Sequence, residues 1–178
     1  DNGSFGVFEY WLDSTDNFGK DNQWFYPLTG DFDGNGKTDV GFIRVPTSDG
    51  AAPWIRIATS NAAGFDIVDG KWRNGDNIYL RTSWEFTAFT GDFNGDGLSD
   101  IGQIHLGSDA DLYIGLTEED LKAAPQSDWL DRGGAIIDFS LFAGDFNGDG
   151  LTDVCMFKKS TGRWDVTCSY GDKFDNIN

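Results

Sequence analysis

Short segments in which hydrophobic and polar residues alternate recur along the chain, separated by turns rich in Gly, Asp and Asn. Alternation with a period of two is typical of extended strands, and frequent strong turns favour antiparallel pairing. Strand-like runs occur at 40–43 (VGFI), 101–104 (IGQI) and 154–157 (VCMF). The pattern predicts an all-β fold of short antiparallel strands, with less than about one-tenth helix.

One segment departs from the strand pattern. Residues 117–124 begin with the N-capping residue Thr117, continue with three acidic residues, contain Lys122 and end before Pro125. This order predicts one short helix in an insertion.

A single motif occurs three times: GDFDGNGKTDV at 30–40, GDFNGDGLSDI at 91–101 and GDFNGDGLTDV at 144–154. The copies are 61 and 53 residues apart, a spacing within the range of a small β unit such as a propeller blade. The sequence therefore predicts one repeat domain over residues 1–178, built from three blade-like sheets, with loops at 31–39, 92–100 and 145–153.

Each loop carries hard oxygen donors at alternate positions, and a backbone carbonyl at the seventh position adds a further candidate ligand. Glycines at the fourth and sixth positions let the backbone turn so that the donors converge. Such a set of oxygens suits Ca²⁺, whereas Mg²⁺ prefers a tighter octahedron with more water. We expect three calcium sites, formed by Asp31, Asp33, Asn35, Lys37 and Asp39; Asp92, Asn94, Asp96, Leu98 and Asp100; and Asp145, Asn147, Asp149, Leu151 and Asp153.

The start of each loop is similar to an EF-hand, but its last acid stands at the ninth position and a strand follows. Asp, Asn and Gly also dominate ordinary turns, so three turns that bind nothing are the alternative. Three carboxylates held close together in each loop repel one another without a cation, which favours the metal.

The GDFNGDGxxD loop resembles the repeat of FG-GAP and VCBS proteins, which include integrin-α-like propellers, propeller lectins and modules of secreted polysaccharide-degrading enzymes. Outside the loops the resemblance is looser: a strand ending in Ser or Thr recurs at 9–14, 54–59, 112–117 and 164–169. The resemblance implies a β-propeller-type fold with calcium in each loop. It also implies that six phenylalanines belong to the blade cores: Phe32, Phe93, Phe146, Phe25, Phe86 and Phe139.

Three repeats are too few for an ordinary closed propeller, which has about four to eight blades. Three solutions stay open at this stage. The chain is a piece of a longer protein, copies assemble, or the terminal strands pair to complete a smaller unit. Exposed strand edges would otherwise favour aggregation.

Composition narrows the function. Of the 178 residues, 39% are hydrophobic, so the chain can bury a core, and a formal charge of −17 repels nucleic acid and anionic membranes. No apolar run approaches the roughly 18–20 residues that span a bilayer, so we expect no membrane insertion. The chain opens without Met or a signal peptide and is interpreted as a mature form or fragment of a secreted, extracellular protein.

The two cysteines bear on the compartment only through their pairing. A two-residue turn at Thr161-Gly162 would place Cys155 opposite Cys168 in a hairpin, which predicts a disulfide. A longer, bulged turn would shift the register and separate them, and two buried free thiols are the alternative.

Catalysis has little support in the sequence. The single histidine, His105, lies in an alternating strand without a nucleophile motif, and no pair among the 30 acidic residues stands out for glycoside hydrolysis. We therefore expect no enzyme activity.

The tryptophans favour binding. Trp54 and Trp164 share a position in the aligned strands and are expected in the core, whereas Trp72, Trp84 and Trp129 do not recur with the repeat. With Arg73 nearby, these rings predict a site for a glycan or polysaccharide through stacking and hydrogen bonds. The alternative is that each ring fills a gap between sheets. The expected function is a calcium-stabilised, non-catalytic carbohydrate-binding module or lectin; the alternative is an extracellular adhesion or structural module that contacts a protein partner or adjoining domain.

Overall fold

The structure, a computed structural model, describes residues 24–45, 54–61, 63–68, 72–73, 86–105, 111–118, 121, 127–131 and 138–175. These residues form three antiparallel β-sheets and contain no helix. The all-β prediction is confirmed. Within the same residues there is accordingly no helix with the length and apolarity to span a membrane.

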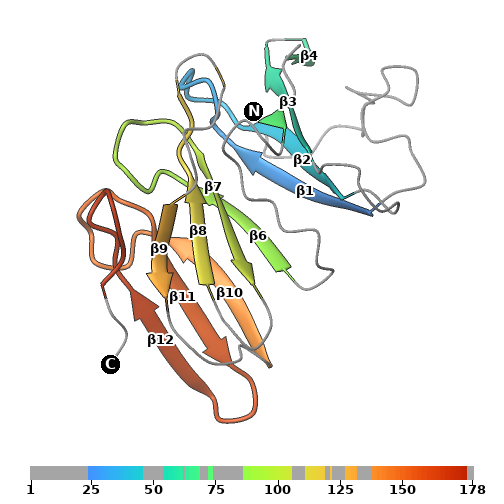
Figure 1. The fold of residues 1–178 in the computed structure, drawn as a ribbon. Coiled ribbons are helices and arrows are strands. Elements are labelled where there is room, and N and C mark those ends of the chain that lie inside the picture. Colours follow the sequence, from blue (N-terminus) through green and yellow to red (C-terminus); the bar gives the residue numbers. More distant parts are fainter. Residues whose placement is uncertain are drawn as a thin grey trace, which may run out of the picture.

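The strands follow one another through the sheets in chain order (Figure 1). The first sheet contains β1 (Trp24–Gly30), β2 (Asp39–Val45), β3 (Trp54–Ser60) and β4 (Phe65–Ile67), with β5 (Trp72–Arg73) also paired to β3. The second contains β6 (Phe86–Gly91), β7 (Asp100–His105), β8 (Asp111–Gly115) and β9 (Ser127–Asp131). The third contains β10 (Phe139–Gly144), β11 (Asp153–Lys158) and β12 (Arg163–Thr167).

Each repeated loop connects the first two strands of its sheet. The flanking residues pair in the same register in all three sheets: Gly30 with Asp39, Gly91 with Asp100 and Gly144 with Asp153. Gly34 and Gly36 have φ of 72° and 80°, in the left-handed region that glycine adopts without a steric penalty. The motif therefore forms a tight hairpin loop, the same in each repeat.

The sheets lie side by side in chain order, and β6 contacts both β1 and β10 (Figure 1). Backbone hydrogen bonds join neighbouring loops: the amide of Ser99 donates to the carbonyl of Asp31, and that of Thr152 to the carbonyl of Asp92, each at 2.7 Å. A Cβ added at Gly91 would lie 2.3 Å from the Thr152 side chain, and one at Gly30 would lie 2.6 Å from Ser99. Glycine before each of these loops is thus required for the sheets to approach so closely.

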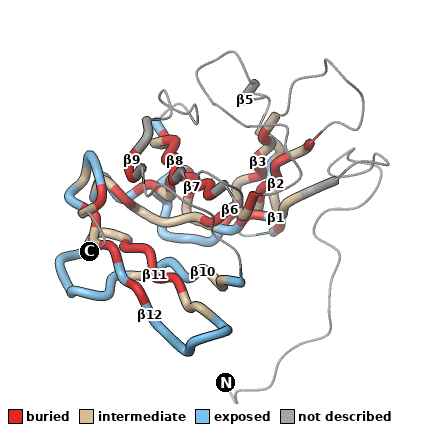
Figure 2. The backbone as a smooth tube through the Cα atoms, turned by 60° about the horizontal axis from the view of Figure 1, so that its bottom comes forward, coloured by how far each residue is buried: buried red, intermediate tan, exposed pale blue. Residues whose placement is uncertain are grey.

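Two hydrophobic clusters fill the spaces between the sheets. The first joins residues of the first sheet, among them Phe32 and Ile57, to Phe86 and Ile101 of the second. The other joins residues of the second sheet, among them Phe93, to Val154 and Met156 of the third. In the third sheet, β11 is largely buried, whereas β10 and β12 on either side of it include exposed residues (Figure 2).

The phenylalanine prediction is confirmed for two loops and wrong for the third. Phe32 and Phe93 are fully buried, whereas Phe146 is 50% exposed. Phe32 and Phe93 are each covered by the next sheet, and Phe146 has no described sheet beyond it. Phe86 is buried and Phe139 packs against the second cluster, while the side chain of Phe25 lies outside the described residues.

The three sheets form an open row, so a closed propeller is not observed among the described residues. The helix expected at 117–124 falls largely outside them. Thr117, Glu118 and Leu121 are described, and none is helical; the Leu121 amide donates to the Glu118 carbonyl at 2.8 Å in a turn.

The disulfide prediction is wrong: Cys155 and Cys168 are free thiols. The β11–β12 hairpin pairs Lys158 with Arg163, which leaves a four-residue connection in place of the expected two-residue turn. Cys155 consequently pairs with Val166. Burial raises the pKa of both thiols, with Asp165 adding to the effect at Cys155.

The shared position expected for Trp54 and Trp164 is also wrong. Trp54 pairs with Arg44, but Trp164 pairs with Phe157, a difference of one residue in register. A shift of one residue moves a side chain to the opposite face of a sheet. Trp54 is half-buried against Phe42, with ring centroids 5.4 Å apart, whereas Trp164 is 59% exposed.

The equivalent positions Phe93 and Phe146 provide a matched test of sheet stacking. Phe93→Ala should lower the free energy of unfolding by about 3–5 kcal/mol, because it leaves a cavity between two sheets. Phe146→Ala should cost about 1 kcal/mol or less, because half of this ring is already in solvent. Urea denaturation of dilute protein measures both. Equal losses would contradict the observed stacking.

Candidate functional site

A fully buried aspartate closes each of the three loops. Asp39, Asp100 and Asp153 each accept two backbone N–H groups, one on each carboxylate oxygen. One donor is the phenylalanine of the same loop, at 2.9 Å; the other stands at the end of the third strand and is Ser60, Thr117 or Ser169, at 2.7, 2.7 and 2.9 Å. The ninth residue thus ties its loop to the third strand of the sheet.

The first loop brings three carboxylates together. One oxygen each from Asp31, Asp33 and Asp39 lie within 4.8 Å of one another. Oδ2 of Asp31 accepts the Gly36 amide at 2.7 Å, but its Oδ1 is buried and has no hydrogen-bond partner. A buried carboxylate oxygen without a partner is costly, and a cation at this point would satisfy it. The donors therefore fit a hard divalent metal.

In the second and third loops, both oxygens of the first aspartate accept backbone amides of the same loop. Asp92 accepts the amides of Gly95 and Gly97 at 2.7 and 2.9 Å. Asp145 likewise accepts those of Gly148 and Gly150 at 2.6 and 3.0 Å. Among the described residues the three-carboxylate grouping is found in the first loop. Oδ1 of Asp145 also accepts the Asp149 amide, at 3.2 Å, but Oδ2 of Asp145 and both oxygens of Asp92 accept one hydrogen bond each. Such an oxygen keeps a lone pair, so the donor set of these loops remains chemically suitable for a metal.

The remaining predicted ligands form a second layer of hydrogen bonds within each loop. In the second and third loops, the asparagine side chain donates to the fifth-position aspartate: Asn94 to Asp96 and Asn147 to Asp149, both at 2.9 Å. In the first loop the order is reversed, and Asn35 donates to Asp33 at 2.9 Å. The seventh residues Lys37, Leu98 and Leu151 donate their amides to the fifth side chain at 2.9, 2.8 and 2.9 Å.

Among the described loop residues, Asp100 is the carboxyl group whose pKa is clearly raised. The pKa of Asp100 is raised to about 7, chiefly by burial and also by the charges of Asp96 and Asp92, although the amides of Thr117 and Phe93 oppose the shift. A carboxylate with such neighbours resists ionisation unless a cation is close.

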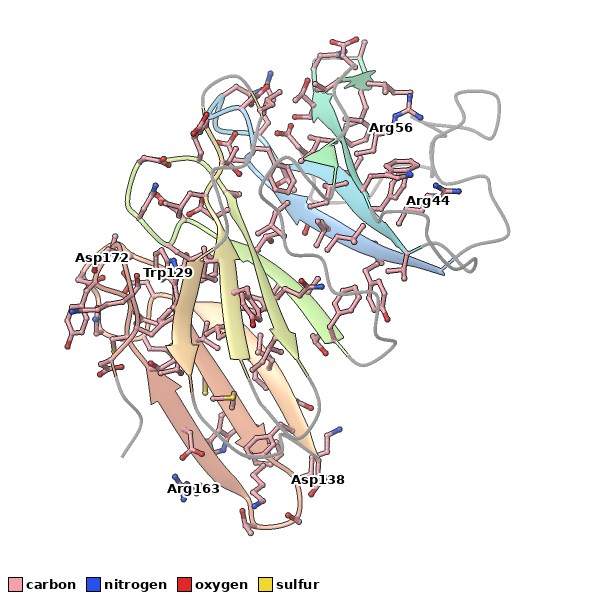
Figure 3. The ribbon with its side chains drawn as sticks, in the orientation of Figure 1. Arg44, Arg56, Trp129, Asp138, Arg163 and Asp172 are labelled. Carbon is pink, nitrogen blue, oxygen red and sulfur yellow. The ribbon has the colours of Figure 1, made fainter. Side chains whose placement is uncertain are left out.

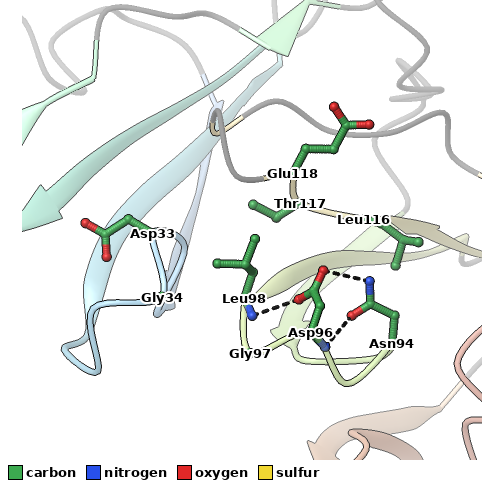
Figure 4. A pocket seen from close by; sticks show the side chains of 9 residues that line it. All are labelled: Asp33, Gly34, Asn94, Asp96, Gly97, Leu98, Leu116, Thr117 and Glu118. Atoms are coloured by element: carbon green, nitrogen blue, oxygen red, sulfur yellow. Dashed lines mark hydrogen bonds between the residues drawn. The ribbon is translucent and has the colours of Figure 1, made fainter.

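A pocket of about 810 Å³ lies between the first and second loops (Figure 4). Asp33 and Gly34 contribute from the first loop, and Asn94, Asp96, Gly97 and Leu98 from the second. Leu116, Thr117 and Glu118, which follow β8, complete the wall. These last three residues were not predicted from the sequence as site residues. The recurring Ser or Thr at the end of the third strand was the available signal, because its amide binds the closing aspartate.

The predicted ligand-binding residues do not converge on this pocket in the described part of the chain. Trp129 is 4% exposed and packs against Phe174 and Phe93, with ring centroids 5.3 and 6.4 Å away (Figure 3). It fills a gap in the core, so we withdraw it as a ligand-stacking residue. Trp72 and Arg73 form β5 beside β3, but their side chains lie outside the described residues, as do Trp84 and the side chain of His105.

A scan against models of protein families finds no match to this chain, and no curated protein matches its sequence. The relation to FG-GAP and VCBS repeats therefore rests on the loop residues and remains an expectation.

The raised pKa of Asp100 predicts a pH dependence of the metal-free protein. Asp100 ionises near 3.8 in the unfolded chain and near 7 in the folded one, so between these values the folded state holds the extra proton. Stability should fall as the pH rises from about 4 to about 7. Asp100→Asn should flatten this slope while lowering stability at every pH, because the amide cannot accept both backbone N–H groups. Urea midpoints measure it; an unchanged slope in the variant would contradict the assignment.

Proposed function

We propose that this protein is a calcium-stabilised, non-catalytic carbohydrate-binding module of the FG-GAP/VCBS type. The observation that carries the calcium proposal is the first loop, where three carboxylates converge and the buried Oδ1 of Asp31 has no partner. The same hairpin is built three times, with the same closing aspartate. We extend the proposal to all three loops on this basis.

Calcium suits the loops better than magnesium. Carboxylate, amide and carbonyl oxygens on a glycine-rich hairpin can supply the six to eight ligands that Ca²⁺ accepts in flexible geometry. Extracellular modules commonly bind calcium with dissociation constants of about 10⁻⁴–10⁻³ M. A chain with a formal charge of −17 gains further from neutralisation. These properties support a secreted, extracellular protein.

The pocket between the first two loops supports a carbohydrate ligand. Its wall presents carboxylates, an amide and a hydroxyl alongside Leu98 and Leu116, a mixture that suits sugar hydroxyls and the apolar face of a ring. Asp33 and Asp96 serve both the pocket and the calcium loops, so calcium would organise the ligand site. Trp72 and Trp84 remain candidates for a stacking platform, now without Trp129.

One observation favours the alternative function, an extracellular module that contacts a protein. The third sheet exposes four large hydrophobic residues on or beside β10 and β12: Phe142, Phe146, Trp164 and Val166. Exposed aromatic groups of this kind are typical of protein interfaces.

Calcium removal tests the metal proposal. At millimolar calcium each occupied loop should add about 0.4–1.4 kcal/mol to the stability, so chelation should lower the melting temperature. Asp31→Asn should reduce both the calcium stoichiometry and this shift, whereas Asp109→Asn, outside the loops, should change neither. Thermal melts in chelator, calcium and magnesium measure the effect. The same midpoint in all three conditions would remove the metal.

The glycan proposal is tested with a residue that belongs to the pocket but not to a calcium loop. Glu118→Ala should weaken glycan binding several-fold while leaving the calcium-dependent melt unchanged, because Glu118 lines the wall and is exposed. Asp172→Ala removes the same charge from the exposed turn that follows β12 and does not line the pocket, so it should have no effect. Array screening followed by titration measures both. Unchanged affinity in Glu118→Ala would place the ligand elsewhere, and no binding on a broad array would favour the protein-contact alternative.

A further inference from the structure

Equivalent residues of the three sheets can be matched through the strand pairing. The residue two before each loop glycine is Leu28, Phe89 or Phe142, and the loop phenylalanine is Phe32, Phe93 or Phe146. On the third strand of each sheet, in sheet order, Ile57 pairs with Gly41, Ile114 with Gly102 and Val166 with Cys155. Two residues earlier on the same strands, Ile55 pairs with Ile43, Leu112 with Ile104 and Trp164 with Phe157. These positions define one face of each sheet, here called the forward face.

The forward faces of the first two sheets are interfaces. Leu28, Phe32, Ile43, Ile55 and Ile57 all belong to the cluster that Phe86 and Ile101 of the second sheet complete. Their equivalents in the second sheet, Phe89, Phe93, Ile104, Leu112 and Ile114, all belong to the cluster that Val154 and Met156 of the third sheet complete. The next sheet therefore covers the forward face in both cases.

The forward face of the third sheet has the same apolar character and no cover among the described residues. Its exposed fractions are 46% for Phe142, 50% for Phe146, 59% for Trp164 and 41% for Val166. Phe142 and Trp164 contact one another, with ring centroids 5.7 Å apart, and Trp164 also stacks on Phe157 at 4.6 Å. The loop glycine of the third sheet is uncovered in the same way. A Cβ added at Gly144 would meet only Phe146, at 3.9 Å. A Cβ added at Gly30 or Gly91 would instead clash with Ser99 or Thr152 of the next loop.

The opposite face of the first sheet carries the residues that would fit it. Within the chain, a sheet covers its neighbour with a Ser or Thr that lies on the loop glycine and an aliphatic residue two positions later: Ser99 and Ile101, or Thr152 and Val154. The first sheet has Thr38 and Val40 at these two positions, exposed and half-buried respectively. The Ser/Thr and aliphatic positions of the inter-sheet contact are therefore present on the first described sheet, and the forward face that they would cover is present on the third.

We propose that the forward face of the third sheet docks the first sheet of a second copy of this chain. Thr38 of that copy lies on Gly144, and its backbone amide donates to the carbonyl of Asp145, as Ser99 and Thr152 do within the chain. Phe142, Phe146, Trp164 and Val166 pack beneath. The contact is heterologous, because each copy uses its third sheet for one neighbour and its first sheet for another; successive copies close into a ring or extend as a filament.

The mass of the protein in millimolar calcium, measured by light scattering over a concentration series, tests this surface. The wild type should exceed the 19.6 kDa of one chain, with the mass rising with concentration. Gly144→Ala should abolish association without loss of stability, because its Cβ meets only the Phe146 ring at ordinary contact distance within one chain but would strike Thr38 of the second copy. Trp164→Ser should weaken association by about thirtyfold, as expected for a central aromatic residue of an interface.

Tyr170→Ser is the control, because this aromatic residue is 62% exposed but lies in the turn beside the second loop, where Gly171 approaches Asn94. It should leave association unchanged.

Mixing two blocked chains tests the head-to-tail geometry. Thr38→Arg blocks the first sheet and Gly144→Ala blocks the third, so each variant alone should be monomeric. A mixture retains one intact pair of faces and should form a dimer of one chain of each kind, twice the mass of a single chain. A monomeric wild type at every concentration would overturn the proposal. Association that Trp164→Ser disrupts and Thr38→Arg does not would also overturn it, since two third sheets would then meet face to face.

Discussion

A buried carboxylate at the end of each loop holds that loop to the third strand of its sheet. Asp39, Asp100 and Asp153 accept an amide from the loop on one oxygen and an amide from the strand end on the other. Because each oxygen of this buried side chain satisfies a backbone amide that would otherwise be costly to bury, this one interaction fixes the loop conformation against the third strand. It also sets where the other loop donors lie. The carboxylate of Asp100, whose pKa is raised to about 7 by burial and its acidic neighbours, shows that the arrangement has an electrostatic cost in the absence of a cation.

The same loops control the stacking of the sheets. The carbonyl of the first loop residue accepts an amide from the next loop, and the preceding glycine allows the close approach. The candidate metal ligands, the strand pairing and the contact between sheets therefore all involve the same hairpin. The polar pocket lies between two of these hairpins, and the third sheet has exposed hydrophobic residues that no described sheet covers.

The features that could be predicted from the sequence are those set by residues close together in the chain. The three loops, their hairpin setting and the burial of Phe32 and Phe93 follow from glycine, turn residues and alternation. Predictions that depended on register or on neighbours failed. The sequence alignment matched Thr59 with Thr117 and Ser169, but Ser60 is the equivalent residue, so Trp54 was wrongly matched with Trp164. A four-residue turn likewise separated the two cysteines. The motif around Phe146 is the same as around Phe93, so no local signal could reveal that one ring is covered by a sheet and the other is not. The burial of Trp129 depends on Phe174, far away in sequence.

The three loops are proposed calcium sites whose occupancy stabilises a binding module, and the first loop holds three converging carboxylates. Calorimetric titration of the metal-free protein with calcium tests this most directly, because it counts the sites and measures their affinity. We expect three calcium ions per chain, one for each loop, with dissociation constants of about 10⁻⁴–10⁻³ M and much weaker binding of magnesium. No calcium binding, or equal binding of magnesium, would contradict it.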